Sequence, residues 1–358
     1  MRTILIKMII LALTVYSVVI SVNYFVDPAN LYHEGTVTKL VDCLNDGKNV
    51  KIPANIDEGV FQEKRIATMT WNPETVIIGS SHVMYMPFDD GSMVYNAGMS
   101  GAYLGDYYAL TGLLQYYDKM PKKIIIGVDP WTFMRGSLDG KHPSLHRYAE
   151  YMKKNIDGSQ DTYYGGNYID DKLKELISLS YFQSSIAYAR KNLFKAEDDV
   201  ETVSDDQIGD DVKIIVDGRR VPSVKNFLTQ KEIDEEILKL LNKGTMYQMG
   251  TGFKEVQHDN IADFEKLLQY LQANGVEVSI YLPVWHPKIY SFFCESEAFS
   301  GVKKIEDTIR KIGYGYQIPV HGGYDPRDCG ITENDFMDYL HLKPEKMKEN
   351  YELILDSK

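Results

Sequence analysis

Residues 74 to 86 read ETVIIGSSHVMYM, an apolar run that ends abruptly in small polar residues at Gly79, Ser80 and Ser81. A short apolar run without alternation is typical of a strand that is buried on both faces, as in a parallel sheet covered by helices. Ligand sites in such sheets lie beyond the carboxyl ends of the strands. The stretch therefore predicts a parallel α/β fold with Ser81 at its functional edge.

Other apolar runs indicate the remaining strands of this sheet. With the first strand at 75–79, they cover residues 93–97, 122–128, 276–282 and 316–320. Stretches with apolar residues at three- and four-residue spacing, typical of amphipathic helices, alternate with the runs. These stretches cover residues 102–117, 260–275 and 302–313, and a last helix begins at Pro344. The alternation predicts a flavodoxin-like, doubly wound α/β domain with a parallel five-stranded sheet.

The amino terminus carries an uncharged apolar run from Met8 to Val26. As a helix, this run is long enough to cross the roughly 30 Å hydrocarbon layer of a membrane. Arg2 and Lys7 precede the run, whereas acidic residues follow it. The positive-inside rule therefore predicts a single-pass signal anchor, with the amino terminus in the cytoplasm and the rest of the chain outside it. A cleaved signal peptide is the alternative.

The chain is expected to consist of three parts. Residues 1–26 form a cytoplasmic stub and transmembrane anchor, 27–73 a juxtamembrane extension, and 74–358 the α/β domain, which an insertion at 134–256 interrupts. The insertion holds an amphipathic stretch, an acidic run that we interpret as a solvated loop, and an Asp217-Gly218 pair typical of a hairpin turn. We interpret the insertion as a helical and hairpin element that caps the sheet as a lid or acceptor platform.

The composition excludes some classes of function. A formal net charge of −12 disfavours a nucleic-acid partner, because such proteins neutralise phosphates with a basic face. The cysteines, Cys43, Cys294 and Cys329, are too few for a disulfide scaffold and lack the paired close spacing of a zinc site. We expect no metal and no cofactor. Two alternatives remain for the cysteines: a disulfide between Cys294 and Cys329, or three free thiols.

Polar residues follow each predicted strand, and three of them have the chemistry of a catalytic triad. Ser81 follows the first strand, and Asp338 and His341 lie just before the last helix. A serine hydroxyl becomes nucleophilic when a histidine accepts its proton, and an aspartate holds that histidine in the required tautomer. We therefore predict Ser81 as nucleophile, His341 as base and Asp338 as its partner.

Three further residues are predicted at the same edge. The backbone N–H groups of Ser81 and Gly98 are expected to bind a developing oxyanion. Asp129 follows the third strand, and His286 follows the fourth. For His286, a substrate contact and a purely structural histidine are the alternatives. His82, next to Ser81, is expected to line the pocket or to cap the following helix.

In these motifs the sequence resembles the SGNH/GDSL hydrolase superfamily. GSS at 79–81 matches its first block, NAG with Gly98 its second, and DYLH at 338–341 its closing block. With the NYFVDP segment at 23–28, the chain looks most like the membrane-anchored extracytoplasmic branch that includes the teichoic-acid D-alanine transfer protein and the alginate O-acetylation proteins. The resemblance implies a membrane-bound O-acyltransferase as partner and a cell-surface glycan or teichoic-type polymer as substrate.

One block departs from the family pattern. The third block usually offers an asparagine that donates a hydrogen bond to the oxyanion, whereas GVDPW places Asp129 there. An ionised carboxylate has no proton to donate. The alternatives are therefore that Asp129 is held protonated, that it serves substrate binding, or that the chemistry is weakened. From the triad and the resemblance, we expect serine-dependent O-acyl transfer or ester hydrolysis on cell-envelope polysaccharide or a related polymer. Because of Asp129, the alternative is a non-catalytic glycan- or partner-binding module of an O-acylation complex.

Overall fold

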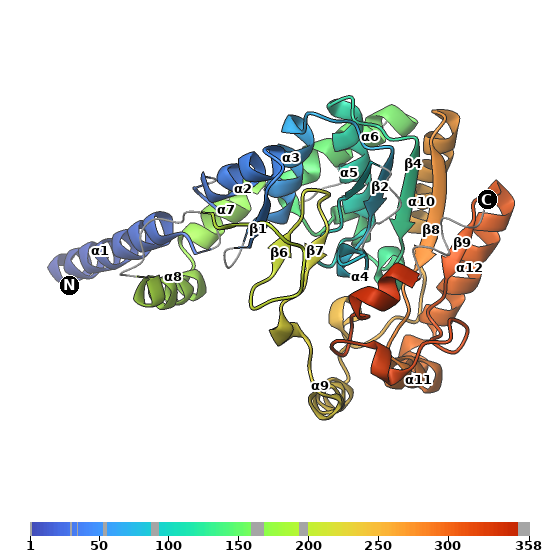
Figure 1. Ribbon diagram of the computed structural model, residues 1–358. Helices are drawn as coiled ribbons and strands as arrows, with labels where there is room; N and C mark the ends of the chain where they lie inside the picture. Colours follow the sequence, from blue (N-terminus) through green and yellow to red (C-terminus); the bar gives the residue numbers. More distant parts are fainter. Residues whose placement is uncertain are drawn as a thin grey trace.

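The computed structural model describes residues 2–28, 31–33, 35–52, 56–86, 93–158, 168–192 and 200–349 (Figure 1). Helix α1 (Arg2–Val26) projects from one side of the molecule. Within the described ranges, it is the one helix long and apolar enough to span a membrane. Its side chains are exposed from Thr3 to Val18. The long apolar helix agrees with a signal anchor and equally with a signal peptide.

A parallel five-stranded sheet forms the centre of the domain, as the sequence predicts. Its strands, in the spatial order β3-β2-β4-β8-β9, are Val94–Asn96, Thr75–Ile78, Lys123–Gly127, Glu277–Leu282 and Val320–Gly322. Counted within this sheet, the order is 2-1-3-4-5, which is the flavodoxin-like order. Thr75 is in register with Val94 on one side and with Lys123 on the other.

The fifth strand is displaced from its expected position. The run at 316–320 was expected to be a strand, but helix α12 (Gly301–Tyr316) continues to its first residue. Gln317 ends the helix in a left-handed conformation with φ 56°, and the strand β9 begins only at Val320. The amphipathic helix extends one turn further than its apolar periodicity indicates, and this moves the strand towards the carboxyl terminus.

Helices α5 (Leu104–Tyr116), α10 (His258–Ala273) and α12 pack with the sheet in one large core. From β8, Val278, Ile280 and Leu282 contribute to this core, while Tyr281 belongs to a separate cluster with Val83. The alternation within the strand therefore divides its side chains between two faces. The expected helices at 102–117, 260–275 and 302–313 are confirmed within a few residues, and the last helix begins at Pro344, as predicted. Its part beyond residue 349 lies outside the described residues.

The juxtamembrane extension and the insertion share a second, antiparallel sheet. Strand β1 of the extension lies between insertion strands in the order β5-β1-β6-β7. Asp217-Gly218 forms the turn between β6 and β7, with Gly218 at φ 87°, as the hairpin prediction requires. The strands are Asn49–Lys51 (β1), Thr202–Val203 (β5), Lys213–Ile214 (β6) and Arg220–Val221 (β7). The helices of the extension and the insertion are α2 (Gly35–Asn45), α3 (Glu58–Thr68), α6 (His146–Asp157), α7 (Tyr168–Leu176), α8 (Leu179–Asn192) and α9 (Gln230–Lys243).

The three cysteines are free in the structure. Cys294 is exposed, and Cys43 and Cys329 are half-buried. The arrangement is that of three free thiols, the second of the two alternatives. Burial raises the pKa of Cys329 to about 11, so this thiol is held in its protonated, unreactive form.

Candidate active site

Ser81, His341 and Asp338 form a continuous chain of hydrogen bonds. The Ser81 Oγ lies 2.9 Å from His341 Nε2, and His341 Nδ1 lies 2.8 Å from Asp338 Oδ2. The expectation that the motif order brings these three side chains together is confirmed as geometry. With the imidazole proton on Nδ1, the ring donates to Asp338, and Nε2 accepts the Ser81 hydroxyl proton. This is the arrangement that base-assisted nucleophilic attack requires.

Asp338 is fixed by its own loop. Its Oδ1 accepts hydrogen bonds from the backbone N–H groups of Leu340 and His341, each at 2.7 Å. Burial favours the neutral acid, but the hydrogen bond and charge of His341 outweigh it and hold the pKa of Asp338 below its ordinary value. The carboxylate is therefore ionised at neutral pH, in the form that orients and stabilises an imidazolium.

The fold explains why Ser81 lies at this edge. Strand β2 ends at Ile78, and the short helix α4 (Ser81–Met84) begins with Ser81 itself. The Ser80 hydroxyl caps the helix by accepting a hydrogen bond from the His82 N–H at 3.2 Å. In a sheet of this strand order, the ligand crevice opens between β2 and β4, where the direction of the connections reverses. Ser81 follows one of these strands, and Asp129 follows the other.

Asp129 is not an isolated carboxylate. Its Oδ1 lies 2.6 Å from His82 Nδ1, and both side chains are buried. The His82 ring packs against both Trp131 and Trp285, with centroids 5.9 and 5.4 Å away, and lies 5.7 Å from the His341 ring. His82 Nε2 and Asp129 Oδ2 have no hydrogen-bond partner among the described residues. The residue expected to line a pocket or cap a helix is thus the partner of Asp129, and Ser80 supplies the cap.

The Gly98 N–H is already engaged. It donates to the Asn96 side-chain oxygen at 2.9 Å, so it is not free to bind an oxyanion in this arrangement. Asn96 ends β3 and its amide also donates to the Val83 carbonyl, which fixes the loop. Within the part of the chain that the structure describes, the backbone N–H groups of Ser81 and Gly101 have no acceptor. Gly101 has φ +61°, a left-handed conformation that favours glycine, and a Cβ there would require the Gln248 side chain, 2.6 Å away, to move.

His286 has the position of a structural residue. It is fully buried against Phe336 and is the N-cap of helix α11 (Pro287–Glu295). Its Nδ1 accepts the Lys288 N–H at 3.3 Å. Burial lowers the pKa of His286 to about 4, so the ring is neutral at neutral pH. Of the two alternatives for this histidine, the geometry matches the structural one.

Tyr247 reaches the site from the insertion, and no sequence motif indicates it. Its ring lies edge-on to Trp131 with centroids 5.4 Å apart. Burial raises the pKa of the Tyr247 hydroxyl, and polar contacts with Gln248 and Ser81 offset part of that rise. The residue has a positive φ of 26°, which is rare for a bulky side chain and is found where surrounding structure imposes it. An aromatic hydroxyl therefore borders the Ser81 side chain.

A half-buried ion pair joins the extension and the insertion beside the site. The Glu58 carboxylate accepts hydrogen bonds from Arg220 and from the Ser100 N–H, the latter at 2.6 Å. Burial alone would raise the pKa of Glu58, but Arg220 and His142 hold it below its ordinary value. Because Ser100 precedes Gly101, this contact fixes the loop that carries the free Gly101 N–H. Sequence reasoning missed this cluster because its members lie in three separate segments.

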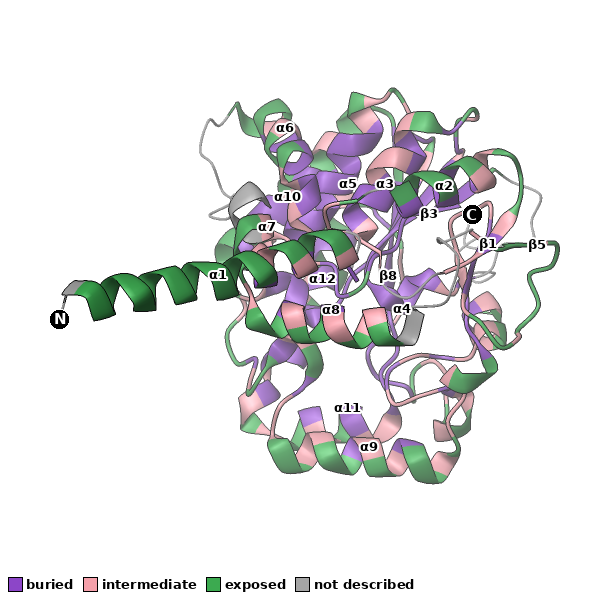
Figure 2. Cartoon of the chain, turned by 90° about the vertical axis from the view of Figure 1, so that its left-hand side faces the viewer, coloured by how far each residue is buried: buried purple, intermediate pink, exposed green. Residues whose placement is uncertain are grey.

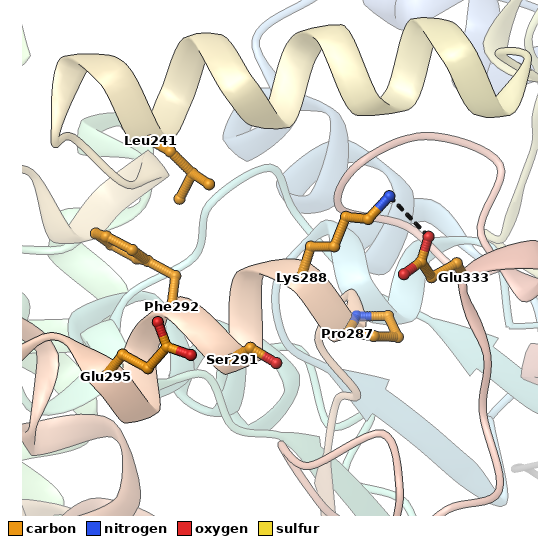
Figure 3. A pocket seen from close by; sticks show the side chains of 7 residues that line it. All are labelled: Leu241, Pro287, Lys288, Ser291, Phe292, Glu295 and Glu333. Atoms are coloured by element: carbon orange, nitrogen blue, oxygen red, sulfur yellow. Dashed lines mark ion pairs between the residues drawn. The ribbon is translucent and has the colours of Figure 1, made fainter.

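A second pocket, between α9 and α11, offers no comparable chemistry (Figure 3). It has a volume of about 290 Å³, and its lysine, Lys288, is paired with Asp234 at 2.6 Å and Glu333 at 2.9 Å. No group of three or more His, Cys, Asp or Glu side chains in the described segments is arranged to bind a metal ion. The residues lining the pocket are Leu241, Pro287, Lys288, Ser291, Phe292, Glu295 and Glu333.

Comparison with known proteins adds no family assignment. No protein-family model matches the chain, and no curated protein matches its sequence at a significant level. The α/β fold and the site geometry are therefore the observations from which a function can be inferred.

Proposed function

We propose that this protein is an SGNH-type serine esterase or O-acyltransferase that acts on O-acyl groups of a cell-envelope polysaccharide or related polymer. The observation that carries the proposal is the Ser81–His341–Asp338 chain, with contacts of 2.9 and 2.8 Å. A binding protein has no need of a serine aligned on a histidine that an ionised aspartate orients. The flavodoxin-like strand order and the motif blocks support the same family.

The reaction begins when Ser81 Oγ attacks the acyl carbonyl. His341 Nε2 takes the serine proton, and Asp338 stabilises the imidazolium that forms. The tetrahedral intermediate collapses to an acyl-serine as His341 returns the proton to the leaving alkoxide. An acceptor hydroxyl, from a sugar or from water, then loses its proton to His341 and attacks the acyl-serine, and Ser81 is regenerated. Exclusion of water by the insertion would favour transfer over hydrolysis.

We assign the oxyanion to the N–H groups of Ser81 and Gly101. Both lack an acceptor among the described residues, whereas the Gly98 N–H is bonded to Asn96. The Asp129 carboxylate, which replaces the usual asparagine donor, is paired with His82. A carboxylate that shares a proton with an imidazole repels a neighbouring oxyanion less than an unpaired one does. The pairing therefore makes Asp129 compatible with catalysis.

We infer that α1 is retained as a single-pass anchor, with the domain outside the cytoplasm. The Asn23 amide, near the end of the helix, donates to the carbonyls of Glu175, Leu176 and Ser178 at 3.3, 2.9 and 3.0 Å. Cleavage of the helix would leave these buried contacts unmade, at a cost in stability. Protease added to spheroplasts should digest the domain. Protection of the whole chain, or recovery of a mature form without α1, would contradict the anchor.

Covalent labelling tests the proposal directly. The purified protein, incubated with an activated ester, should acquire an acyl adduct on the peptide that contains Ser81, as detected by mass spectrometry. Ser80→Ala is the matched control, because it removes a hydroxyl from the same turn and leaves the adduct in place. An adduct on the Ser81→Ala variant, or none on the folded natural chain with several activated esters, would contradict a serine nucleophile.

The second candidate is a non-catalytic glycan- or partner-binding module of a membrane O-acylation complex. The replacement of the oxyanion asparagine by Asp129 favours it. It predicts that cells carrying only a folded, expressed Ser81→Ala protein acylate their envelope normally. Under the catalytic proposal, a membrane-bound O-acyltransferase is the partner that supplies acyl groups, and loss of Ser81 abolishes acylation.

A further inference from the structure

The end of α1 is tied to the α7–α8 turn by a satisfied polar network. Asn23 is fully buried, donates to three carbonyls at 175–178, and accepts from the Ser185 hydroxyl at 3.3 Å. Asp27 accepts from the backbone N–H groups of Leu31 and Tyr32 at 2.8 Å and from the Tyr181 hydroxyl at 2.7 Å. Buried polar groups are paired in this way in protein interiors, so the network fixes the end of α1 against the α7–α8 turn.

The exposed part of α1 is shorter than a membrane. The apolar span of 24 residues runs from Thr3 to Val26, but Val19 is already buried, at 3% exposure, where α8 begins to cover the helix. Figure 2 shows α8 running beside the end of α1. The part in which every side chain is exposed, Thr3 to Val18, corresponds to about 24 Å of helix, whereas the hydrocarbon layer is about 30 Å thick. The membrane boundary therefore falls at the level where α8 and the α7–α8 turn pack against α1.

Three apolar side chains point outward at this level. Leu173 on α7, Ile177 in the α7–α8 turn and Leu179 at the start of α8 are 54%, 51% and 58% exposed. Ile177 lies within the 175–178 segment whose carbonyls bind Asn23, so it stands beside α1. Phe25 is 78% exposed, and Tyr24 contacts the Phe25 and Tyr32 rings at 5.3 and 5.7 Å. Aromatic side chains at the end of a transmembrane helix are typical of the membrane–water interface.

We propose that the α7–α8 turn, through Leu173, Ile177 and Leu179, enters the outer interfacial layer of the bilayer in which α1 is anchored. The occupant of this surface is lipid, because the three side chains continue the exposed apolar surface of α1 at the depth where the bilayer must extend beyond Val18. The proposal rests on the inferred anchor. Insertion of the turn would be a second membrane attachment. It would fix the orientation of the domain above the bilayer, whereas α1 alone would let the domain rotate.

The test places a probe at each depth in the full chain. In a variant with Cys43, Cys294 and Cys329 changed to serine, single cysteines at Ile177, Leu179 or Leu11 receive an environment-sensitive fluorophore. The protein is reconstituted in vesicles of phosphatidylcholine and phosphatidylglycerol. Leu238→Cys is the matched control, because Leu238 lies on α9 and its 58% exposure equals that of Leu179.

The expected result is quenching of the 177 and 179 probes by spin-labelled lipids, with iodide protection severalfold greater than at 238. The probe at 11 should be quenched by lipid alone. If the probes at 177 and 179 are quenched by iodide as strongly as the probe at 238, while the probe at 11 is quenched by lipid alone, the second attachment is overturned and the anchor is retained. Iodide quenching at 11 as well would overturn both.

A second measurement keeps the native cysteines, in case their replacement impairs folding. A photoreactive amino acid at Ile177, expressed in cells, should give lipid adducts on irradiation, whereas the same group at Leu238 should give none. A protein adduct at 177 without lipid adducts would overturn the proposal, because the surface would then be covered by a partner subunit.

Discussion

The His82 imidazole and the Asp129 carboxylate, 2.6 Å apart, form a buried pair directly beside the Ser81–His341 contact. From the sequence, His82 was expected only to line the pocket or cap a helix, and Asp129 was a departure from the asparagine of the family pattern. Together they make a buried hydrogen-bonded pair in which each side chain supplies the polar partner of the other. Removing either one alone leaves a buried ionisable group without its partner, which is more costly than removing both.

His82→Phe should therefore destabilise the fold strongly. The carboxylate of Asp129 is then buried without a partner, and the expected loss is about 3 kcal/mol or more in the free energy of unfolding. Adding Asp129→Asn should recover part of this loss, because the amide carries no charge. Urea denaturation of the natural chain, His82→Phe, Asp129→Asn and the double variant measures the coupling. Equal stability of the single and double variants would contradict a coupled pair.

Ser81→Ala should abolish acylation while leaving the fold intact. The hydroxyl is one oxygen at the start of a short helix, and loss of a triad member costs on the order of 10⁴ to 10⁶ in rate. Envelope acylation in cells and adduct formation in vitro are the measurements. Ser80→Ala, which removes the helix cap, should instead cost about 1 kcal/mol of stability and keep most of the activity. The reverse pattern would assign the nucleophile to Ser80.

Asp338→Asn should lower the rate by about 10⁴, because an amide no longer stabilises the imidazolium and favours the wrong histidine tautomer. The asparagine oxygen can still accept from the Leu340 and His341 N–H groups, so the loop should keep its shape. The rate of acylation by an activated ester measures the first effect, and thermal unfolding measures the second. A rate within tenfold of the natural protein would remove Asp338 from the triad.

Tyr247→Phe should keep the ring against Trp131 and remove the hydroxyl beside Ser81. A single neutral polar contact is worth about 1 kcal/mol, so the expected change in acylation rate is severalfold, far smaller than for the triad variants. Tyr247→Ala should additionally open the site and raise the ratio of hydrolysis to transfer. Competition between water and an added sugar acceptor measures this ratio. An unchanged ratio would show that Tyr247 does not exclude water.

Stability should fall as the pH drops from 6.5 towards 4. Burial lowers the pKa of His286 from 6.5 to about 4, so in this range the unfolded chain binds more protons than the folded one, and protons favour unfolding. His286→Asn can still accept the Lys288 N–H as helix cap but cannot titrate, so its urea midpoint should vary less with pH over this range. His258→Asn, at an exposed imidazole, is the matched control. Parallel pH profiles for the natural chain and His286→Asn would contradict the assignment.

The sheet and the triad were predictable because each leaves a local signal. Short apolar runs such as 75–79 and 122–128 are typical of strands buried in a covered parallel sheet, and strand ends of such a sheet share one edge. The rule of strand ends therefore brought Ser81 and His341 together, although 260 positions separate them. The fifth strand was predicted too early in the sequence because helical periodicity does not mark where a helix ends. Nothing in the sequence indicates that Gln317 adopts the left-handed conformation that ends α12.

The remaining parts of the site depend on packing between distant segments. Tyr247 reaches Ser81 only because the insertion returns to the sheet, and no spacing rule relates the two. The engagement of the Gly98 N–H by Asn96 follows from a side-chain rotamer, which a motif does not encode. Pairing of His82 with Asp129 requires the register between β2 and β4, in which Thr75 lies beside Lys123. Sequence motifs indicate which residues meet at the candidate site, whereas the packing of distant segments determines which of their polar atoms can bind a substrate.

The central position of β1 in the antiparallel sheet has a consequence for how the chain is assembled. Asn49 pairs with Val203, so the extension leaves the ribosome long before its partner strands exist, and the sheet closes late across a very large loop. Until then, Val50, which is fully buried in the finished protein, can pack against α2 and α3 but lacks its insertion partner Ile214. Folding of the extension must wait for the insertion, and a shortened chain beginning at residue 74 would lack the strand on which the insertion is nucleated. The segment between anchor and domain is thus an early-synthesised, late-folding part of the domain itself, and trimming it should produce aggregation instead of a smaller soluble enzyme.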